Sequence, residues 1–97
     1  MEEQILTDFF HAARLRDTAM MAGVSTVDFN PRTDGIVDSF DVVATAPGDP
    51  RGDIREVTLD AHVRRLDGGT SRRMMSVTLQ RGGSRRWQVT AWRFVSG

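Results

Sequence analysis

Hydrophobic residues at the N-terminal end of the chain recur with the period of an α-helix. Between Glu2 and Ala22 they return every three or four residues and so line one side of a helix. The residues on that side are Ile5, Leu6, Phe9, Phe10, Ala13 and Met20. Asp17 interrupts the stripe, and its carboxylate is suited to accept hydrogen bonds from the first turn of a second short helix. We therefore expect a helical segment that is broken in two and ends at Gly23.

After Gly35 the pattern changes to alternation, which is typical of strands with one buried face. A first strand is expected over residues 36–46, followed by a loop rich in proline and glycine over residues 47–53. Three further strands carry inward residues at alternate positions: Val57, Leu59, Ala61 and Val63 in the second, Met75, Val77 and Leu79 in the third, and Trp87, Val89 and Ala91 in the fourth. The pattern predicts an antiparallel sheet of about four strands with one apolar face.

Two glycine-rich turns set the predicted strand register. Inward residues pair with inward residues only when the numbers of the paired positions add up to an even number. A three-residue loop over residues 67–69 meets this condition, and so does one over residues 82–84. The second loop sets Arg81 opposite Arg85, and we expect an anion to bind between these two like charges.

The predicted register also gives the outer face of the sheet an apolar cluster. It sets Met74 opposite Trp92 and Arg72 opposite Phe94, on the side away from the helices. Large apolar side chains at this place need a cover, so we expect these four residues to form a homodimer interface. Alternatively, a β-bulge near Ala91 turns Trp92 toward the core. The sequence leaves both arrangements open.

Length and composition describe one ordinary globular domain over residues 1–97. The chain has 97 residues, of which 39% are hydrophobic and 27% charged. It has no cysteine, which excludes disulfides, thiolate metal sites and thiol nucleophiles. No apolar run approaches the roughly 18 residues of a membrane span, so we expect a soluble protein without one. The compartment stays open: cytoplasmic, or exported if a leader has been removed.

Charge is divided unevenly along the chain, although 13 basic residues balance 13 acidic ones. Residues 1–53 hold four arginines and ten acids, whereas residues 54–97 hold nine arginines and three acids. This asymmetry favours self-association or an anionic partner. Arginine doublets stand at the two predicted hairpin ends, roughly 25 Å apart, so we expect no nucleic-acid groove. All basic residues are arginine, which we attribute to a bacterial type of composition.

Few residues are candidates for chemistry. The chain has no tyrosine, His11 falls on the polar side of the first helix, and Asp60 and His62 fall on the strand face away from the core. Two ligands do not make a metal site, and no two carboxylates have the spacing of an acid and base pair. We therefore expect no catalytic residue, metal or cofactor, and consider an enzyme the less favoured interpretation.

The order of these elements carries a family resemblance. The segments concerned are the helix over residues 5–13, the Arg16-Asp17 turn, the step over residues 29–31 and the closing strand from Arg86 to Thr90. This order resembles the nuclear transport factor 2-like and cystatin-like superfamily. The resemblance implies an α+β roll, in which a helix lies across a curved antiparallel sheet. Members include small-molecule isomerases and dehydratases with a pocket between helix and sheet, and many non-catalytic dimerising domains.

Two functions from different classes follow. The first is a non-enzymatic interaction or accessory domain that forms a homodimer through the outer sheet face. The alternative is a small-ligand-binding protein or degenerate enzyme with an apolar pocket between helix and sheet. The residues expected to line that pocket are Phe9, Phe10, Met20 and Trp87. Anion or nucleic-acid binding is a third interpretation, in which nucleic acid is disfavoured.

Overall fold

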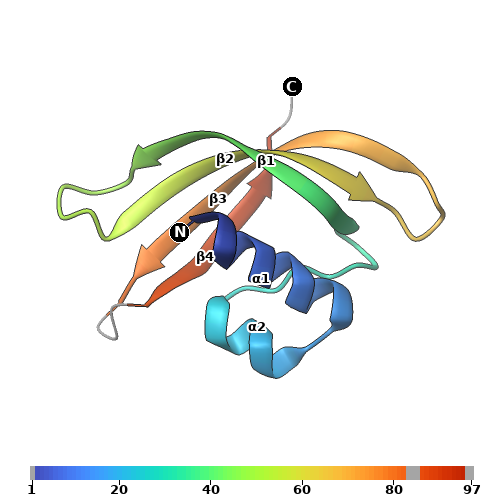
Figure 1. The fold of residues 1–97 in the computed structure, drawn as a ribbon, viewed down its shortest axis with the longest axis horizontal. Coiled ribbons are helices and arrows are strands. Elements are labelled where there is room, and N and C mark those ends of the chain that lie inside the picture. The colour runs from blue at the N-terminus through green and yellow to red at the C-terminus, as the bar shows by residue number, and fades with distance from the viewer. Residues whose placement is uncertain (1, 83–85, 96–97) are drawn as a thin grey trace.

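The chain folds into two helices followed by a four-stranded antiparallel sheet that does not close (Figure 1). The computed structural model describes residues 2–82 and 86–95. The elements are α1 (Glu2–Leu15), α2 (Thr18–Val24), β1 (Ile36–Pro47), β2 (Ile54–Arg64), β3 (Thr70–Arg81) and β4 (Trp87–Phe94). Neighbouring strands follow the order β1-β2-β3-β4. The predicted α+β class is confirmed, and the arrangement is compatible with a roll.

The helical segment is broken where the sequence predicts it. Asp17 is the N-cap of α2, and its Oδ1 accepts a hydrogen bond from the Met20 N–H at 3.0 Å. Arg16, just before it, has a φ of 54°, a left-handed conformation that ends α1. Because α2 starts a new helix, its residues do not continue the stripe of α1. Met20 is consequently 37% exposed, and Met21 packs against the core instead.

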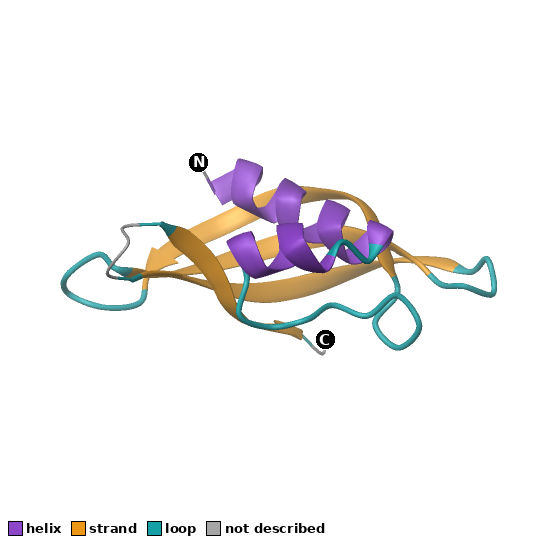
Figure 2. Ribbon diagram, turned by 90° about the horizontal axis from the view of Figure 1, so that it is seen from below, coloured by secondary structure: helices purple, strands orange, loops and turns teal. Residues whose placement is uncertain are grey.

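Both helices lie on one side of the sheet, beneath its arch in Figure 1 and in front of it in Figure 2. The core between the two layers contains apolar residues of α1, of the strands and of the segment that joins α2 to β1. Phe29 of that joining segment is 1% exposed. Its ring contacts the rings of four other aromatic residues: Phe9, Phe10, Trp92 and Phe94. This aromatic cluster fixes the joining segment between α1 and β4.

The hairpin of β2 and β3 keeps the predicted inward face although its loop is longer than predicted. Val57 pairs with Val77, so inward residues do pair with each other. The last strand pair is Arg64 with Thr70, and the loop between them spans residues 65–69. The left-handed glycine of this loop is Gly68, with a φ of 93°. A slip of two residues leaves the parity of the pairing intact, which is why the core face is unchanged.

The pairing of β3 with β4 differs from the predicted register. Trp87 pairs with Arg81, and Val89 pairs with Leu79. The register then shifts by one residue, so that Trp92 lies opposite Val77 and faces the core. A β-bulge causes such a change of face because one extra residue reverses the alternation that follows it. The arrangement that sets Met74 opposite Trp92 is therefore wrong, and the bulged alternative is the one observed.

Candidate functional site

The four residues expected to line an apolar pocket differ in their burial. Phe9, Phe10 and Trp87 are buried members of the core, whereas Met20 is exposed on α2. Met20 does not continue the apolar stripe of α1, because α2 begins a new helical phase at Thr18, and its place in a ligand pocket stays a prediction. The space beneath α1 is occupied by packed aromatic and aliphatic side chains.

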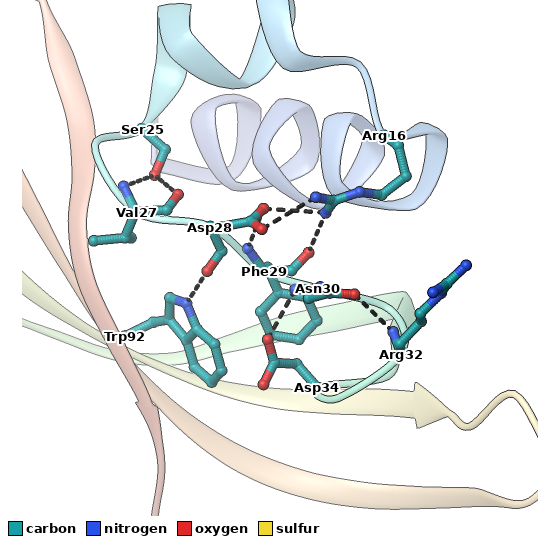
Figure 3. A network of polar contacts seen from close by, with 9 residues as sticks. All are labelled: Arg16, Ser25, Val27, Asp28, Phe29, Asn30, Arg32, Asp34 and Trp92. Carbon is teal, nitrogen blue, oxygen red and sulfur yellow. Dashed lines mark hydrogen bonds and ion pairs between the residues drawn. The ribbon is translucent and has the colours of Figure 1, made fainter.

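The expected interface residues divide between the two faces of the sheet. Arg72 and Met74 are exposed on the outer face, as predicted. Trp92 and Phe94 lie on the inner face, and their outward placement is corrected by the bulge in β4. The Trp92 ring lies 4.6 Å from the Phe29 ring, centroid to centroid, and its Nε1 donates to the Asp28 carbonyl at 2.9 Å (Figure 3).

Arg81, one of the two residues of the expected anion site, contacts an indole ring and a carboxylate. The residue opposite Arg81 is Trp87, and the Arg81 guanidinium lies 5.1 Å from the centroid of that indole ring. Its Nη2 also lies 3.1 Å from a carboxylate oxygen of Asp53. The charge of Arg81 is thus already met within the chain, and Arg85 lies outside the described residues.

A different hollow gathers arginines that the sequence does not associate with one another. It has a volume of about 420 Å³ and lies where the segment before β1 meets the hairpin of β2 and β3. Its lining consists of Pro31, Arg32, Thr33, Asp34, Gly35, Val63, Arg65, Leu66, Ser71 and Arg73. We call this site the basic hollow. The two arginine doublets near the hairpin were the only sequence signal for it, and Arg32 gave none.

The segment that carries Arg32 is anchored upstream by Asp28 (Figure 3). Arg16 donates from Nη1 and Nη2 to the two carboxylate oxygens of Asp28, each at 3.1 Å, and from Nη1 to the Phe29 carbonyl at 3.2 Å. The Arg16 hydrogen bond lowers the pKa of the Asp28 carboxyl below its usual range. With Trp92 holding the Asp28 carbonyl, the backbone is fixed from the helix side and from the sheet side.

A tight turn then presents Arg32 at the rim of the basic hollow. The Asn30 N–H donates to Asp34 Oδ2 at 2.8 Å, and the Arg32 N–H donates to Asn30 Oδ1 at 3.0 Å. In Figure 3 the Arg32 side chain extends outward from this turn, away from Asp34. Gly35 closes the turn with a φ of 92°, and a Cβ at this position would lie 2.6 Å from Val63 Cγ1. Glycine is therefore required for the turn to approach β2 this closely.

The hairpin of β2 and β3 supplies the other two arginines. The Arg65 N–H donates to the Gly69 carbonyl at 2.7 Å, which places Arg65 in the hairpin loop. The Arg73 guanidinium lies 3.9 Å from the centroid of the Phe94 ring, a distance at which a cation is attracted to an aromatic face. Arg65 and Arg73 thus reach the hollow from a loop and from a strand.

Within the described ranges, the three arginines of the basic hollow have no carboxylate partner in an ion pair. Four arginines elsewhere form ion pairs with aspartate: Arg16 with Asp28, Arg64 with Asp38, Arg72 with Asp60 and Arg81 with Asp53. The one carboxylate in the lining is Asp34, which is engaged by the Asn30 N–H. Three arginines and one aspartate leave the lining with a net charge of +2.

A second hollow, of about 330 Å³, lies between α1 and β1. Three of its polar side chains have neighbours as partners: His11 Nδ1 lies 3.2 Å from Arg14 Nη2, and Asp38 accepts from Arg64 Nε at 3.0 Å. The hydrogen bond from Arg64 lowers the pKa of the Asp38 carboxyl. Its lining contains one arginine and two acids, so it lacks the excess of positive charge found in the basic hollow.

Nothing in the described residues adds a metal site or a membrane span. No cluster of three or more histidine, aspartate or glutamate side chains is placed to hold a metal ion there. Neither described helix is long and apolar enough to cross a membrane. No model of a known protein family matches the chain, and no curated protein or solved structure matches it either.

Proposed function

We propose that this protein is a non-catalytic interaction module that binds an anionic group in the basic hollow. The observation that carries the proposal is that Arg32, Arg65 and Arg73 line one hollow and that none has a carboxylate partner among the described residues. Like charges gathered in one place repel each other, and a bound anion relieves that repulsion. The guanidinium group is the side chain best matched to phosphate and carboxylate oxygens.

The strength of such binding can be bounded. A hydrogen bond to a charged group contributes about 1.5–3 kcal/mol. Two such bonds to one small anion correspond to a dissociation constant on the order of 1 mM, and a third strengthens it further. The anchoring of the Arg32 turn and the stacking of Arg73 on Phe94 reduce the conformational entropy lost on binding.

Titration with inorganic phosphate at low salt tests the proposal. We expect the amide NMR signals of residues 32–35 and 65–73 to shift. Arg65→Gln and Arg73→Gln should each weaken binding about tenfold, because each removes one charge-assisted hydrogen bond. Arg51→Gln, in the loop between β1 and β2 and outside the hollow, is the matched control and should leave affinity unchanged. The test uses phosphate at 10 mM, about ten times the dissociation constant of about 1 mM derived above. If no amide signal of the wild-type protein shifts at this concentration, the proposal is contradicted.

Pairing of two copies through the outer sheet face is a second candidate function. Met74 and Val95 are each 37% exposed, and the Val95 N–H donates to the Met74 carbonyl, so the two form a small apolar centre on this face. Asp41 of β1 and Asp60 of β2 lie opposite each other on this face, and Asp60 forms an ion pair with Arg72. This role is consistent with the resemblance to the nuclear transport factor 2-like superfamily, which includes non-catalytic dimerising domains. The two-helix, four-strand arrangement is compatible with the roll of that superfamily.

The charges of the outer face are self-complementary about a two-fold axis. An axis parallel to the strands, between β2 and β3, sets β1 of one copy over β4 of the other. Asp41 on β1 and Arg93 on β4 lie on this face without an ion-pair partner among the described residues. With this axis, Asp41 of one copy and Arg93 of the other are offset along the strand direction by two residues, about 7 Å. An arginine side chain is long enough to span this offset. We propose that Asp41 of each copy meets Arg93 of the other.

A charge exchange tests this pairing. Sedimentation of wild-type protein should show a dimer at tens of micromolar. Arg93→Glu should weaken it through like-charge repulsion with Asp41, and the double variant Arg93→Glu with Asp41→Arg should restore it. A wild-type protein that remains monomeric at several hundred micromolar contradicts the pairing. It would leave the anion site unaffected.

A further inference from the structure

We infer that the ligand of the basic hollow is a small phosphate monoester with an apolar organic group. The inference rests on the proposed function and names the class of anion that the hollow selects. Three features of the lining lead to it: its net charge, the separate origins of its donors, and its exposed apolar side chains.

The net charge of the lining matches a dianion. Three arginines and Asp34 give +2, whereas a carboxylate carries one negative charge. A phosphate monoester carries about −1.5 to −2 at pH 7, because its second ionisation has a pKa near 6. A carboxylate or a sulfate ester would leave about one positive charge of the hollow unmet. Charge balance therefore favours the phosphate monoester.

The donors reach the hollow from three separate parts of the fold. Arg32 comes from the turn before β1, Arg65 from the hairpin loop and Arg73 from β3. Thr33 and Ser71 add hydroxyl groups to the same lining. A carboxylate has two oxygens in one plane, whereas a phosphate monoester presents three terminal oxygens in a tetrahedral arrangement. Donors from three segments are better satisfied by the tetrahedral group.

Apolar side chains beside the arginines indicate that the phosphate carries an organic group. Leu66 is 63% exposed and lines the hollow together with Pro31 and Val63. An exposed leucine next to cations is suited to the apolar part of an ester whose phosphate lies between the guanidinium groups. The volume of about 420 Å³ is that of a small-molecule site.

The ligand's ionisation predicts how binding depends on pH. The titratable groups of the lining are Arg32, Arg65, Arg73 and Asp34, and none is a histidine. Between pH 5.5 and 7.5 the charge that changes is therefore that of the phosphate. With a pKa near 6, the dianion falls from nearly all of the ester at pH 7.5 to about a quarter at pH 5.5, so affinity should fall about fourfold.

Calorimetric titration with three probes of similar shape tests the inference: phenyl phosphate, phenyl sulfate and benzoate. At pH 7.5 we expect phenyl phosphate to bind about tenfold more tightly than the two monoanions, because it makes one further charge interaction. Its affinity should fall about fourfold at pH 5.5, and that of phenyl sulfate, which has no second ionisation, should stay constant.

Leu66→Ala tests the apolar contact. It should bring phenyl phosphate affinity down to that of inorganic phosphate, while inorganic phosphate binding is unchanged. The control is Leu15→Ala, since Leu15 is 58% exposed at the end of α1 and outside the hollow. Thermal unfolding of both variants should match wild type, because both side chains are exposed.

The outcomes separate the two levels of the argument. Equal binding of the three probes, or a phenyl phosphate affinity that does not change with pH, overturns the phosphate monoester and leaves anion binding in place. Failure of all three probes and of inorganic phosphate to bind overturns both. If Leu66→Ala leaves the affinity for phenyl phosphate unchanged, the hollow does not recognise an apolar organic group on the phosphate. That result overturns the inference as stated.

Discussion

Phe29→Ala is expected to lower the free energy of unfolding by about 3–5 kcal/mol, the range observed when a buried phenylalanine is truncated. Phe29 is 1% exposed and contacts four aromatic rings that belong to α1 and β4. Truncation leaves a cavity at the place where the segment before β1 joins both layers. For a domain of this size, whose total stability is about 5–15 kcal/mol, the loss approaches unfolding.

Urea denaturation followed by far-UV circular dichroism measures this effect. Phe29→Leu is the conservative comparison and should cost about 1.5 kcal/mol or less, because it preserves most of the apolar volume. Val43→Ala, at an exposed position of β1, is the surface control and should change stability by about 0.5 kcal/mol at most. A Phe29→Ala variant as stable as the Val43→Ala control would show that the aromatic cluster does not support the core.

Trp92→Ala is expected to destabilise the monomer by about 3 kcal/mol, because it removes a large ring from the core side of β4. The substitution also removes the Nε1 hydrogen bond to the Asp28 carbonyl and the ring contact with Phe29. Trp92→Phe retains a ring but not the donor, and should cost about 1 kcal/mol. Met74→Ala, on the outer face, should stay within about 0.5 kcal/mol of wild type.

Equilibrium unfolding and sedimentation, carried out on the same variants, distinguish a core tryptophan from an interface tryptophan. The inward Trp92 predicts loss of stability at every protein concentration. An outward Trp92 would instead leave the monomer stable and weaken association alone. That second result would contradict the observed register of β4 and the bulge that produces it.

Local features of the chain could be predicted from the sequence because their causes lie within a few residues. Asp17 supplies a cap to residues immediately after it, so the break between α1 and α2 needs no distant contact. Alternation along β2 and β3 defines which face of the hairpin is buried. The same face stays buried if the loop is lengthened by two residues, because inward residues still pair with inward residues. For the same reason an error of two residues in the loop did not change the core.

The bulge in β4 was decided by tertiary contacts. One extra residue reverses every side chain after it, and nothing in the local sequence chooses between the two faces for Trp92. The choice is made by Phe29 and by the Asp28 carbonyl, which lies 64 residues away in the chain from the indole that binds it. The outer cluster predicted from the unbroken alternation therefore does not exist.

The basic hollow likewise depends on long-range structure. The sequence shows arginine doublets at a hairpin, but pairing within the sheet assigns Arg64 to Asp38 and Arg72 to Asp60, which leaves their neighbours Arg65 and Arg73 without a carboxylate among the described residues. Arg32 joins them because the turn before β1 is folded against the sheet by Gly35 and by the anchors of Asp28. The sequence by itself determined which segments are helix and strand and which face of β2 and β3 is buried, since these follow from local periodicity. Only the tertiary structure decided which arginines are neutralised and which share a site, because charge pairing depends on distances between segments that the chain order does not contain.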